Sequence, residues 1–194
     1  MERERQILEA ARDLFLRDGL QGMTMRKIAA AVGISAPAIY KHYADKDEIL
    51  RRVVDLGRER FASFLVRGLK GETPKERLLL TGESYVEFGL TEPRDYQVMF
   101  TVWDKLKPGV HAPGNQGGHA SLLQFSLDRV RECLPPGAPA SPADVFELGL
   151  MFWAECHGLV TLYISGGGSG FMPLDQYREI SKRQLRRLVE AVLR

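Results

Sequence analysis

Apolar residues recur at helical spacing along most of the chain, and this periodicity limits the possible fold more than any other feature. In the first segment Ile7, Ala11, Leu14 and Phe15 stand at positions i, i+4, i+7 and i+8 with charged residues between them. This is the pattern of a helix with one buried face. No strand-like alternation of useful length occurs. The sequence therefore predicts an all-α fold of about nine helices, separated by Gly- and Pro-containing breaks.

The spacing of these breaks changes near residue 50. Three short helices with Gly turns are expected before it, a long helix over about residues 46–70 crosses it, and the later helices are longer and richer in aromatic residues. We therefore expect an N-terminal domain over residues 1–48 and a larger C-terminal domain over residues 49–194. Connectors are expected at the Gly- or Pro-rich stretches 107–118, 135–142 and 165–170.

Composition narrows the class of protein. The 194 residues are 44% hydrophobic and 27% charged, with a formal net charge of +2, so the chain is not of the disordered type and its charge alone does not indicate nucleic acid. Cys133 and Cys156 form no C-x-x-C pair, which argues against a disulfide framework or a cysteine-rich zinc site. No secretory signal pattern opens the chain, and no apolar stretch reaches the length of a membrane span. We expect a soluble cytoplasmic protein without a membrane partner.

Residues 24–43 predict a helix-turn-helix. Thr24 suits the N-cap of a short helix, and the sequence Val32-Gly-Ile-Ser35 suits the turn before a second helix, which Ser35 can cap. That second helix begins with small side chains, which let a helix end approach base edges closely. No acidic residue occurs between Asp18 and Asp45, as a polyanionic partner requires. The same pattern also fits a three-helix cluster with only a structural role.

Individual side chains of this motif suit different parts of a DNA contact. Arg26 could bind a guanine edge with two hydrogen bonds or pair with a phosphate. Thr24 and the free N–H groups of its helix could hold a phosphate. Tyr40, Lys41 and His42 combine hydrogen-bond donors with positive charge, as contacts to the DNA backbone need. The candidate DNA-binding residues are Thr24, Arg26, Lys27, Ser35, Ala36, Pro37, Ala38, Tyr40, Lys41, His42 and Lys46.

Residues 7–50 resemble the DNA-binding domain of the TetR family of bacterial transcription regulators. Around the third expected helix, the family pattern is filled by Gly33, Ser35, Pro37, Tyr40, His42, Tyr43 and Lys46. Two positions depart from the commoner choice: Tyr43 stands where Phe is commoner, and Ala38 stands where Thr is often found.

The resemblance implies how such a domain would meet DNA. Phosphate contacts are implied for Tyr40, His42 and Lys46. Contacts in the major groove are implied for Arg26, residues 35–38 and Lys41. The resemblance also implies a homodimer in which each subunit reads one half of a near-palindromic operator.

Aromatic residues and methionines concentrate in the C-terminal part. They could form an ordinary hydrophobic core, or some could line an apolar cavity for a small-molecule effector. The candidate effector-binding residues are Tyr85, Phe88, Tyr96, Met99, Phe100, Trp103, Phe125, Phe152, Trp153 and His157. Few charges interrupt this set, so we expect an apolar or aromatic effector, with Glu83, Glu87 and Glu155 as further polar candidates to orient it.

Two features of the C-terminal part extend the resemblance. Trp153, His157 and Gly158 are similar to the Trp-x-x-x-His-Gly signature of one C-terminal sensor class in the TetR family. The helices expected over about residues 143–165 and 173–193 have apolar faces too large for one neighbour, and the resemblance suggests that they form a four-helix dimer interface.

No catalytic constellation is present in the sequence. Cys156 and His157 are adjacent, so on a helix they point in different directions, and His111 and His119 lack a metal-ligand spacing. We expect no enzyme, no cofactor and no metal. The predicted function is a ligand-responsive DNA-binding transcriptional repressor, which a small apolar or aromatic effector releases from its operator. The alternative is a helical DNA-binding or protein-interaction module without small-molecule control.

Overall fold

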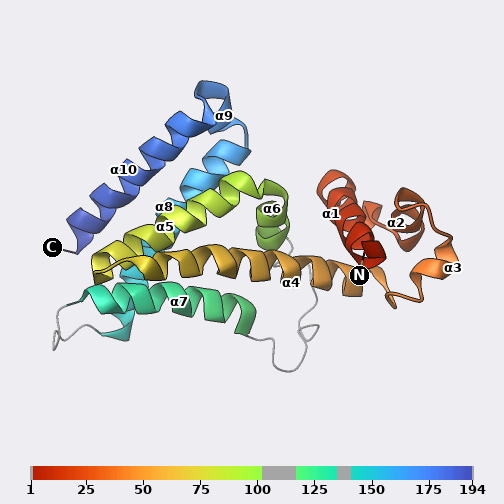
Figure 1. Ribbon diagram of the computed structural model, residues 1–194, viewed down its shortest axis with the longest axis horizontal. Coiled ribbons are helices and arrows are strands. Elements are labelled where there is room, and N and C mark those ends of the chain that lie inside the picture. The colour runs from red at the N-terminus through yellow and green to blue at the C-terminus, as the bar shows by residue number, and fades with distance from the viewer. Residues whose placement is uncertain (1, 102–116, 135–140, 194) are drawn as a thin grey trace. The chain divides into compact units, whose positions relative to one another are not determined.

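The computed structural model describes residues 2–101, 117–134 and 141–193. These described residues form helices and no strand, which confirms the all-α prediction (Figure 1). The helices are α1 (Glu2–Gly22), α2 (Met25–Ala31), α3 (Ala36–Ile39), α4 (Lys46–Leu65), the 3-10 helix η1 (Val66–Lys70), α5 (Pro74–Thr91), α6 (Pro93–Thr101), α7 (Gly117–Cys133), α8 (Pro142–Ile164), α9 (Gly167–Phe171) and α10 (Leu174–Val192).

The chain forms two compact units. The first unit contains Met1–Arg60 and Glu92–Ala112, and the second contains Phe61–Thr91 and Pro113–Arg194. Helix α6 therefore belongs to the same unit as α1, α2 and α3, although α4 and α5 separate it from them in the sequence. This grouping makes α6 a structural part of the unit that carries the helix-turn-helix.

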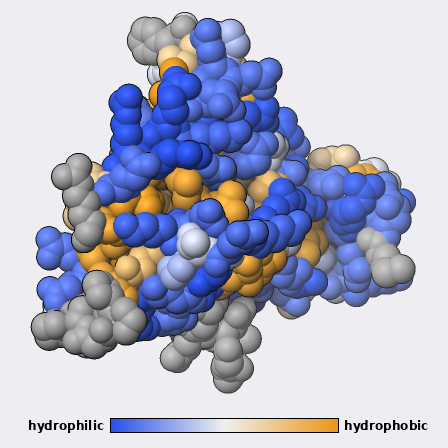
Figure 2. Space-filling view, turned by 60° about the vertical axis from the view of Figure 1, so that its left-hand side comes forward, coloured by the Kyte–Doolittle hydropathy of each residue, from blue (hydrophilic) through white to orange (hydrophobic). Residues whose placement is uncertain are grey.

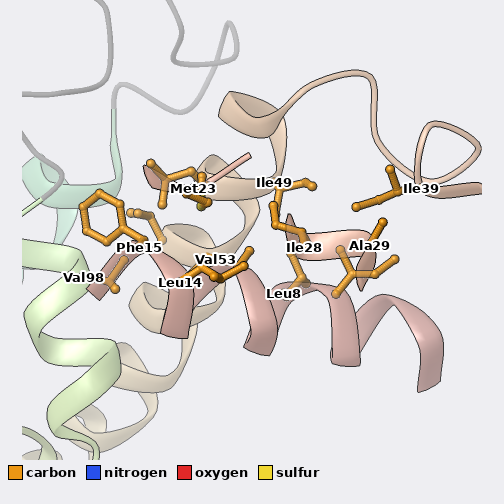
Figure 3. Packing of buried hydrophobic residues seen from close by; sticks show 14 residues of the cluster. Leu8, Leu14, Phe15, Met23, Ile28, Ala29, Ile39, Ile49, Val53 and Val98 are labelled. Carbon is orange, nitrogen blue, oxygen red and sulfur yellow. The ribbon is translucent and has the colours of Figure 1, made fainter. Parts of the chain in front are cut away.

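Five helices share the core of the first unit (Figure 3). The stripe of Ile7, Ala11, Leu14 and Phe15 on α1 is buried, as its spacing predicts. It belongs to one cluster with Ile28 and Ala29 from α2, Ile39 from α3, Ile49 and Val53 from α4 and Val98 from α6. Since burial of one such large side chain stabilises a fold by about 1.5–3 kcal/mol, this shared core fixes α2 and α3 firmly on α1 and α4.

Helix α5 is the centre of the second unit, where it packs against η1, α7, α8 and α10 (Figure 1). Two glycines of α5 allow α8 to come close. A Cβ atom added at Gly82 would lie 2.5 Å from Phe152 Cζ, and one added at Gly89 would lie 2.2 Å from Val160 Cγ1. Arg178 of α10 ties that helix to α5 through two hydrogen bonds of 2.9 Å to the Glu87 carboxylate.

Two segments of the second unit differ from the sequence-based expectations. The Gly-rich stretch 165–170, expected as a connector, contains most of the short helix α9. Helix α8 is long and apolar enough, by length and composition alone, to cross a membrane, although no such stretch was expected; only 33% of its most apolar window is buried. Most of the expected connectors 107–118 and 135–142 lies outside the described residues.

On the second unit, apolar side chains reach the surface between hydrophilic ones (Figure 2).

Candidate nucleic-acid interface and sensor core

Backbone geometry and a contact from α1 fix the turn between α2 and α3. Helix α2 begins at the N-cap Thr24, whose Oγ1 accepts a hydrogen bond from Lys27 N at 3.2 Å, as predicted. Gly33 has φ +69°, a conformation that glycine adopts without strain. Arg3 Nη1 donates to the carbonyl oxygen of Val32 at 2.9 Å. The end of α2 is therefore held in place from α1 before the chain turns into α3.

Most of the candidate DNA-binding side chains lie at the surface. Tyr40 is 57% exposed, while its neighbour Ile39 is fully buried. The buried Ile39 side chain holds the end of α3 in place, and the residue after it presents its polar group to solvent. Ser35 precedes α3 as expected but makes no side-chain cap hydrogen bond, because Pro37 has no N–H and the Ala38 N–H bonds to the Ser35 carbonyl oxygen at 2.9 Å. The exposed candidates are Thr24, Arg26, Lys27, Ser35, Pro37, Tyr40, Lys41 and His42, and the half-buried ones are Ala36, Ala38 and Lys46.

The C-terminal part of α1, which is kinked at Gly19, contacts two of the candidate lysines. Asp18 Oδ2 lies 3.1 Å from Lys27 Nζ, and Arg17 donates to the same carboxylate from Nε at 2.7 Å and Nη2 at 3.0 Å. Hydrogen bonds from Arg17 and Lys27 hold the pKa of the Asp18 carboxyl well below its usual range. Lys46 Nζ donates to the carbonyl oxygen of Leu20 at 2.8 Å. The sequence shows an acid-free window that begins after Asp18, but it does not show that Asp18 itself contacts this window.

The start of α4 is capped by two carboxylates. Asp45 Oδ1 accepts a hydrogen bond from Glu48 N at 2.7 Å, a bond typical of helix N-caps. The Glu48 carboxylate accepts from Ala44 N at 2.6 Å, one residue earlier than in a standard capping box. These bonds fix the first turn of α4, which carries Lys46.

Three candidate effector-binding residues form a hydrogen-bonded cluster in the second unit. Trp153 Nε1 donates to the Tyr85 hydroxyl at 3.1 Å, and that hydroxyl lies 3.2 Å from His157 Nδ1. The Phe61 ring meets the Tyr85 ring edge-on, with centroids 4.9 Å apart. Burial lowers the pKa of His157, which favours the neutral ring, whose Nδ1 can accept a hydrogen bond from the Tyr85 hydroxyl.

The full set of candidate effector-binding residues is distributed over both units. Tyr96, Met99 and Phe100 lie on α6 in the first unit, and Trp103 lies outside the described residues. Those of the second unit are Tyr85, Phe88, Phe125, Phe152, Trp153 and His157. Helices α5, α7, α8 and α10 enclose a narrow apolar gap of about 10 Å³ with Phe152 among its lining residues, which is room for roughly one water molecule.

The polar candidates Glu83 and Glu87 have different surroundings. Glu87 is bound by Arg178 of α10. Burial raises the pKa of Glu83, although Lys182 and Arg186 act in the opposite direction. The paired carboxylate of Glu87 is therefore part of the α5–α10 contact. For Glu83, the effect of burial on the pKa outweighs the opposing effect of the nearby positive charges.

Asp95 on α6 is a further polar residue that the sequence did not single out. It is only 5% exposed, and its two carboxylate oxygens accept hydrogen bonds of 2.6 Å from Arg12 of α1 and Arg60 of α4. A buried carboxylate needs such partners to offset its lost hydration. The bonds join α6 to two other helices of the first unit, and no local pattern in the sequence connects these three positions.

The described residues offer little to catalysis. Among residues 2–101, 117–134 and 141–193, no group of three or more His, Cys, Asp or Glu side chains is placed to hold a metal ion. Burial raises the pKa of the Cys156 thiol, and a thiol kept protonated is a poor nucleophile.

A glycine turn between two short helices, exposed cations on and next to those helices and a second, larger helical unit are typical of a helix-turn-helix protein of the DNA-binding class. Residues 7–53 match the bacterial regulatory proteins of the tetR family, and residues 78–188 match the tetracyclin repressor-like C-terminal domain. The chain belongs to the TetR family. Membership in a family of regulatory proteins supports the expectation that this chain is not an enzyme.

Characterised relatives share parts of the chain. The transcriptional activator FasR of Mycolicibacterium smegmatis is 28% identical over 100 residues, which are 51% of this chain and 46% of FasR. The regulator AcrR of Shigella flexneri is 25% identical over 149 residues, 74% of this chain and 69% of AcrR. The chain thus spans less than half of the length of FasR.

Solved structures of the same fold cover nearly the whole chain. The TetR-family regulator PfmR of Thermus thermophilus superposes with a TM-score of 0.76 at 20% identity, over 95% of this chain and 97% of PfmR. AibR, solved with isovaleryl coenzyme A and operator DNA, superposes with a TM-score of 0.75 at 19% identity, over 93% of this chain and 96% of AibR. At these identities the likeness shows the fold alone.

Proposed function

We propose that this protein is a cytoplasmic transcriptional regulator that binds a palindromic operator as a homodimer and releases it when a small molecule binds. The observation that carries the proposal is the exposed surface of α2, α3 and the turn that follows α3, which presents Arg26, Lys41 and His42. Residues 19–44, which include this surface, contain no Asp or Glu. In this proposal residues 1–48 read DNA, and residues 49–194 bind the effector and form the dimer.

The side chains of this surface have two proposed roles. Arg26 and the small residues 35–38 at the start of α3 face base edges in the major groove, together with Lys41. Tyr40, His42 and Lys46 contact phosphates, with Thr24 and Lys27 beside them. The packing of Ile39 in the core of the first unit supports this assignment, because it fixes the position of α3 on the other helices of that unit.

The proposed dimer interface is built on α8 and α10. Phe146, Leu150 and Trp153 stand at i, i+4 and i+7 on α8 and are 49%, 45% and 38% exposed. An apolar stripe of this kind on a soluble chain is a typical contact between subunits. Helix α8 is apolar enough for a membrane span, although only 33% of its most apolar window is buried within one chain. A second copy of the chain that covers this stripe explains both observations.

The proposed effector is apolar or aromatic and binds near the cluster of Tyr85, Trp153 and His157. AibR, which shares the fold, is solved with isovaleryl coenzyme A, so acyl thioesters belong in the first panel of compounds to be tested. The Trp-x-x-x-His-Gly signature at residues 153–158 supports a sensor domain of that class. An effector that prefers one tilt of α4 changes the distance between the two α3 helices, and a tenfold change in operator affinity needs about 1.4 kcal/mol of differential binding.

Selection of bound duplexes from a random pool tests this function. We expect the enriched sequence to contain two inverted half-sites. Arg26→Ala should relax the preference at one base pair of each half-site by about 1–3 kcal/mol, whereas Tyr40→Phe should weaken the binding of all duplexes alike. Enrichment of no common sequence would contradict the proposal. If the DNA-binding results hold but no compound of the panel changes operator affinity, the alternative of a module without small-molecule control is supported.

A further inference from the structure

Residues on both sides of the kink at Gly19 of α1 contact two lysines of the proposed DNA-binding surface. Asp18 pairs with Lys27 of α2, and the carbonyl oxygen of Leu20 accepts a hydrogen bond from Lys46 at the start of α4. The two contacts differ in charge. A carbonyl group leaves the positive charge of Lys46 available to an anion, whereas the carboxylate of Asp18 offsets the charge of Lys27.

The position of Asp18 favours this pair in the free protein. The Asp18 side chain is 22% exposed, against 51% for Lys27, and it lies against Gly22, where an added Cβ would be 2.3 Å from Asp18 Cβ. Arg17 holds the same carboxylate through two further hydrogen bonds. Because Arg17 can keep Asp18 paired, Lys27 can leave for another anion without leaving the carboxylate unpartnered.

We propose that Asp18 competes with DNA phosphate for Lys27 and so lowers the affinity of the protein for every duplex. The inference rests on the proposed function, since it requires that α2 lies on DNA. Phosphate contacts supply the part of binding that does not depend on sequence, and each cation that meets a phosphate steepens the salt dependence. A carboxylate that pairs with one of these cations weakens the sequence-independent part of DNA binding and leaves the contacts to bases unchanged.

Asp18→Asn tests the proposal, because the amide keeps the shape of the carboxylate and removes its charge. Affinity is measured by fluorescence anisotropy for two labelled duplexes, one of random sequence and one enriched by selection, over a series of KCl concentrations. We expect the variant to bind both duplexes several-fold more tightly at low salt and by the same factor. The log–log salt slope should steepen by about 0.9 for each subunit whose Lys27 meets a phosphate, which is about 1.8 for the proposed dimer.

Asp13→Asn is the matched control. Asp13 lies on the same helix, and the substitution changes the net charge equally, but Asp13 pairs with Arg94 at 2.9 Å, which lies outside the proposed DNA-binding surface. We expect it to leave the salt slope unchanged. Thermal unfolding of both variants shows whether either substitution disturbs the fold, and an Asp18→Asn protein that is folded but binds DNA with the wild-type slope overturns the proposal.

Lys27→Met provides a second, independent measurement. It should lower DNA affinity only slightly while Asp18 is present and by a clearly larger factor in the Asp18→Asn background, because the released lysine then contributes fully. Equal effects in both backgrounds would overturn the role of Asp18 while DNA binding stands. Failure of the wild-type protein to bind either duplex at low salt would instead overturn the proposed function, and the competition with it.

Discussion

His157 is the residue whose surroundings make the clearest statement about protonation. Its Nδ1 lies 3.2 Å from the hydroxyl of Tyr85, which also accepts a hydrogen bond from Trp153. The Tyr85 proton can be donated to His157 only while Nδ1 is unprotonated. Burial lowers the pKa of His157, so the folded protein favours the neutral imidazole, whose Nδ1 can accept this hydrogen bond.

The stability of the second unit should therefore depend on pH. A histidine whose pKa is lowered on folding binds more protons in the unfolded chain, so its contribution is fully present above the ordinary pKa of 6.5 and falls as the pH drops below that value. We expect the melting temperature of the wild-type protein to decrease between about pH 7.5 and about pH 5.5. His157→Gln, which cannot titrate, should show a smaller decrease. Parallel profiles for the two proteins would contradict this account of the cluster.

Helix α6 shows how an element acquires its role from distant contacts. Val98 lies in the core of the first unit, and Asp95 accepts hydrogen bonds from α1 and α4. Gly57 of α4 brings that helix close to α6, since a Cβ there would lie 3.0 Å from Met99 Cγ. The helix is thus held by apolar packing and by charged hydrogen bonds at the same time, so a displacement of α6 displaces α1 and α4 with it.

Asp95→Asn should measure the strength of this attachment. The amide leaves Arg12 and Arg60 facing a neutral group, and loss of one partner from a buried ion pair destabilises proteins by about 3–5 kcal/mol. We expect the lower end of that range in urea unfolding, since Arg60 is 47% exposed. Arg94→Gln is a matched control on the same turn, because the Arg94–Asp13 pair is exposed and should contribute less than about 1 kcal/mol. Equal effects of the two substitutions would show that Asp95 does not anchor α6.

Most of the helices could be predicted because each has an apolar stripe and ends near glycine or proline. Helix α9 could not, since a glycine-rich stretch has low helix propensity and this one forms in contact with α8. The exposed surface of α2 and α3 follows from local spacing and remains a predicted DNA-binding site. The contacts of Asp18 and Asp95 could not be predicted, because Lys27, Arg60 and Arg12 lie 9, 35 and 83 residues from their partners.

The whole molecule is proposed to act as a dimer, and α8 is the element on which that depends. Leu150→Glu places a charge in the middle of its exposed apolar stripe and should dissociate the dimer, because burial of an unpaired carboxylate between subunits is strongly unfavourable. Leu69→Glu on η1 is the matched control, with 46% exposure against 45% for Leu150. We expect the control to remain dimeric in sedimentation and to keep its operator affinity, while Leu150→Glu sediments as a monomer and binds the operator weakly.

The central claim is that two copies of the helix-turn-helix read two halves of one operator. The most direct test is the mass of the complex between the purified protein and a selected duplex, measured by light scattering together with the affinity for a duplex that keeps a single half-site. The account predicts two chains on the full site, or a multiple of two, and a large loss of affinity for the half-site. A single wild-type chain bound with equal affinity to both duplexes would contradict it.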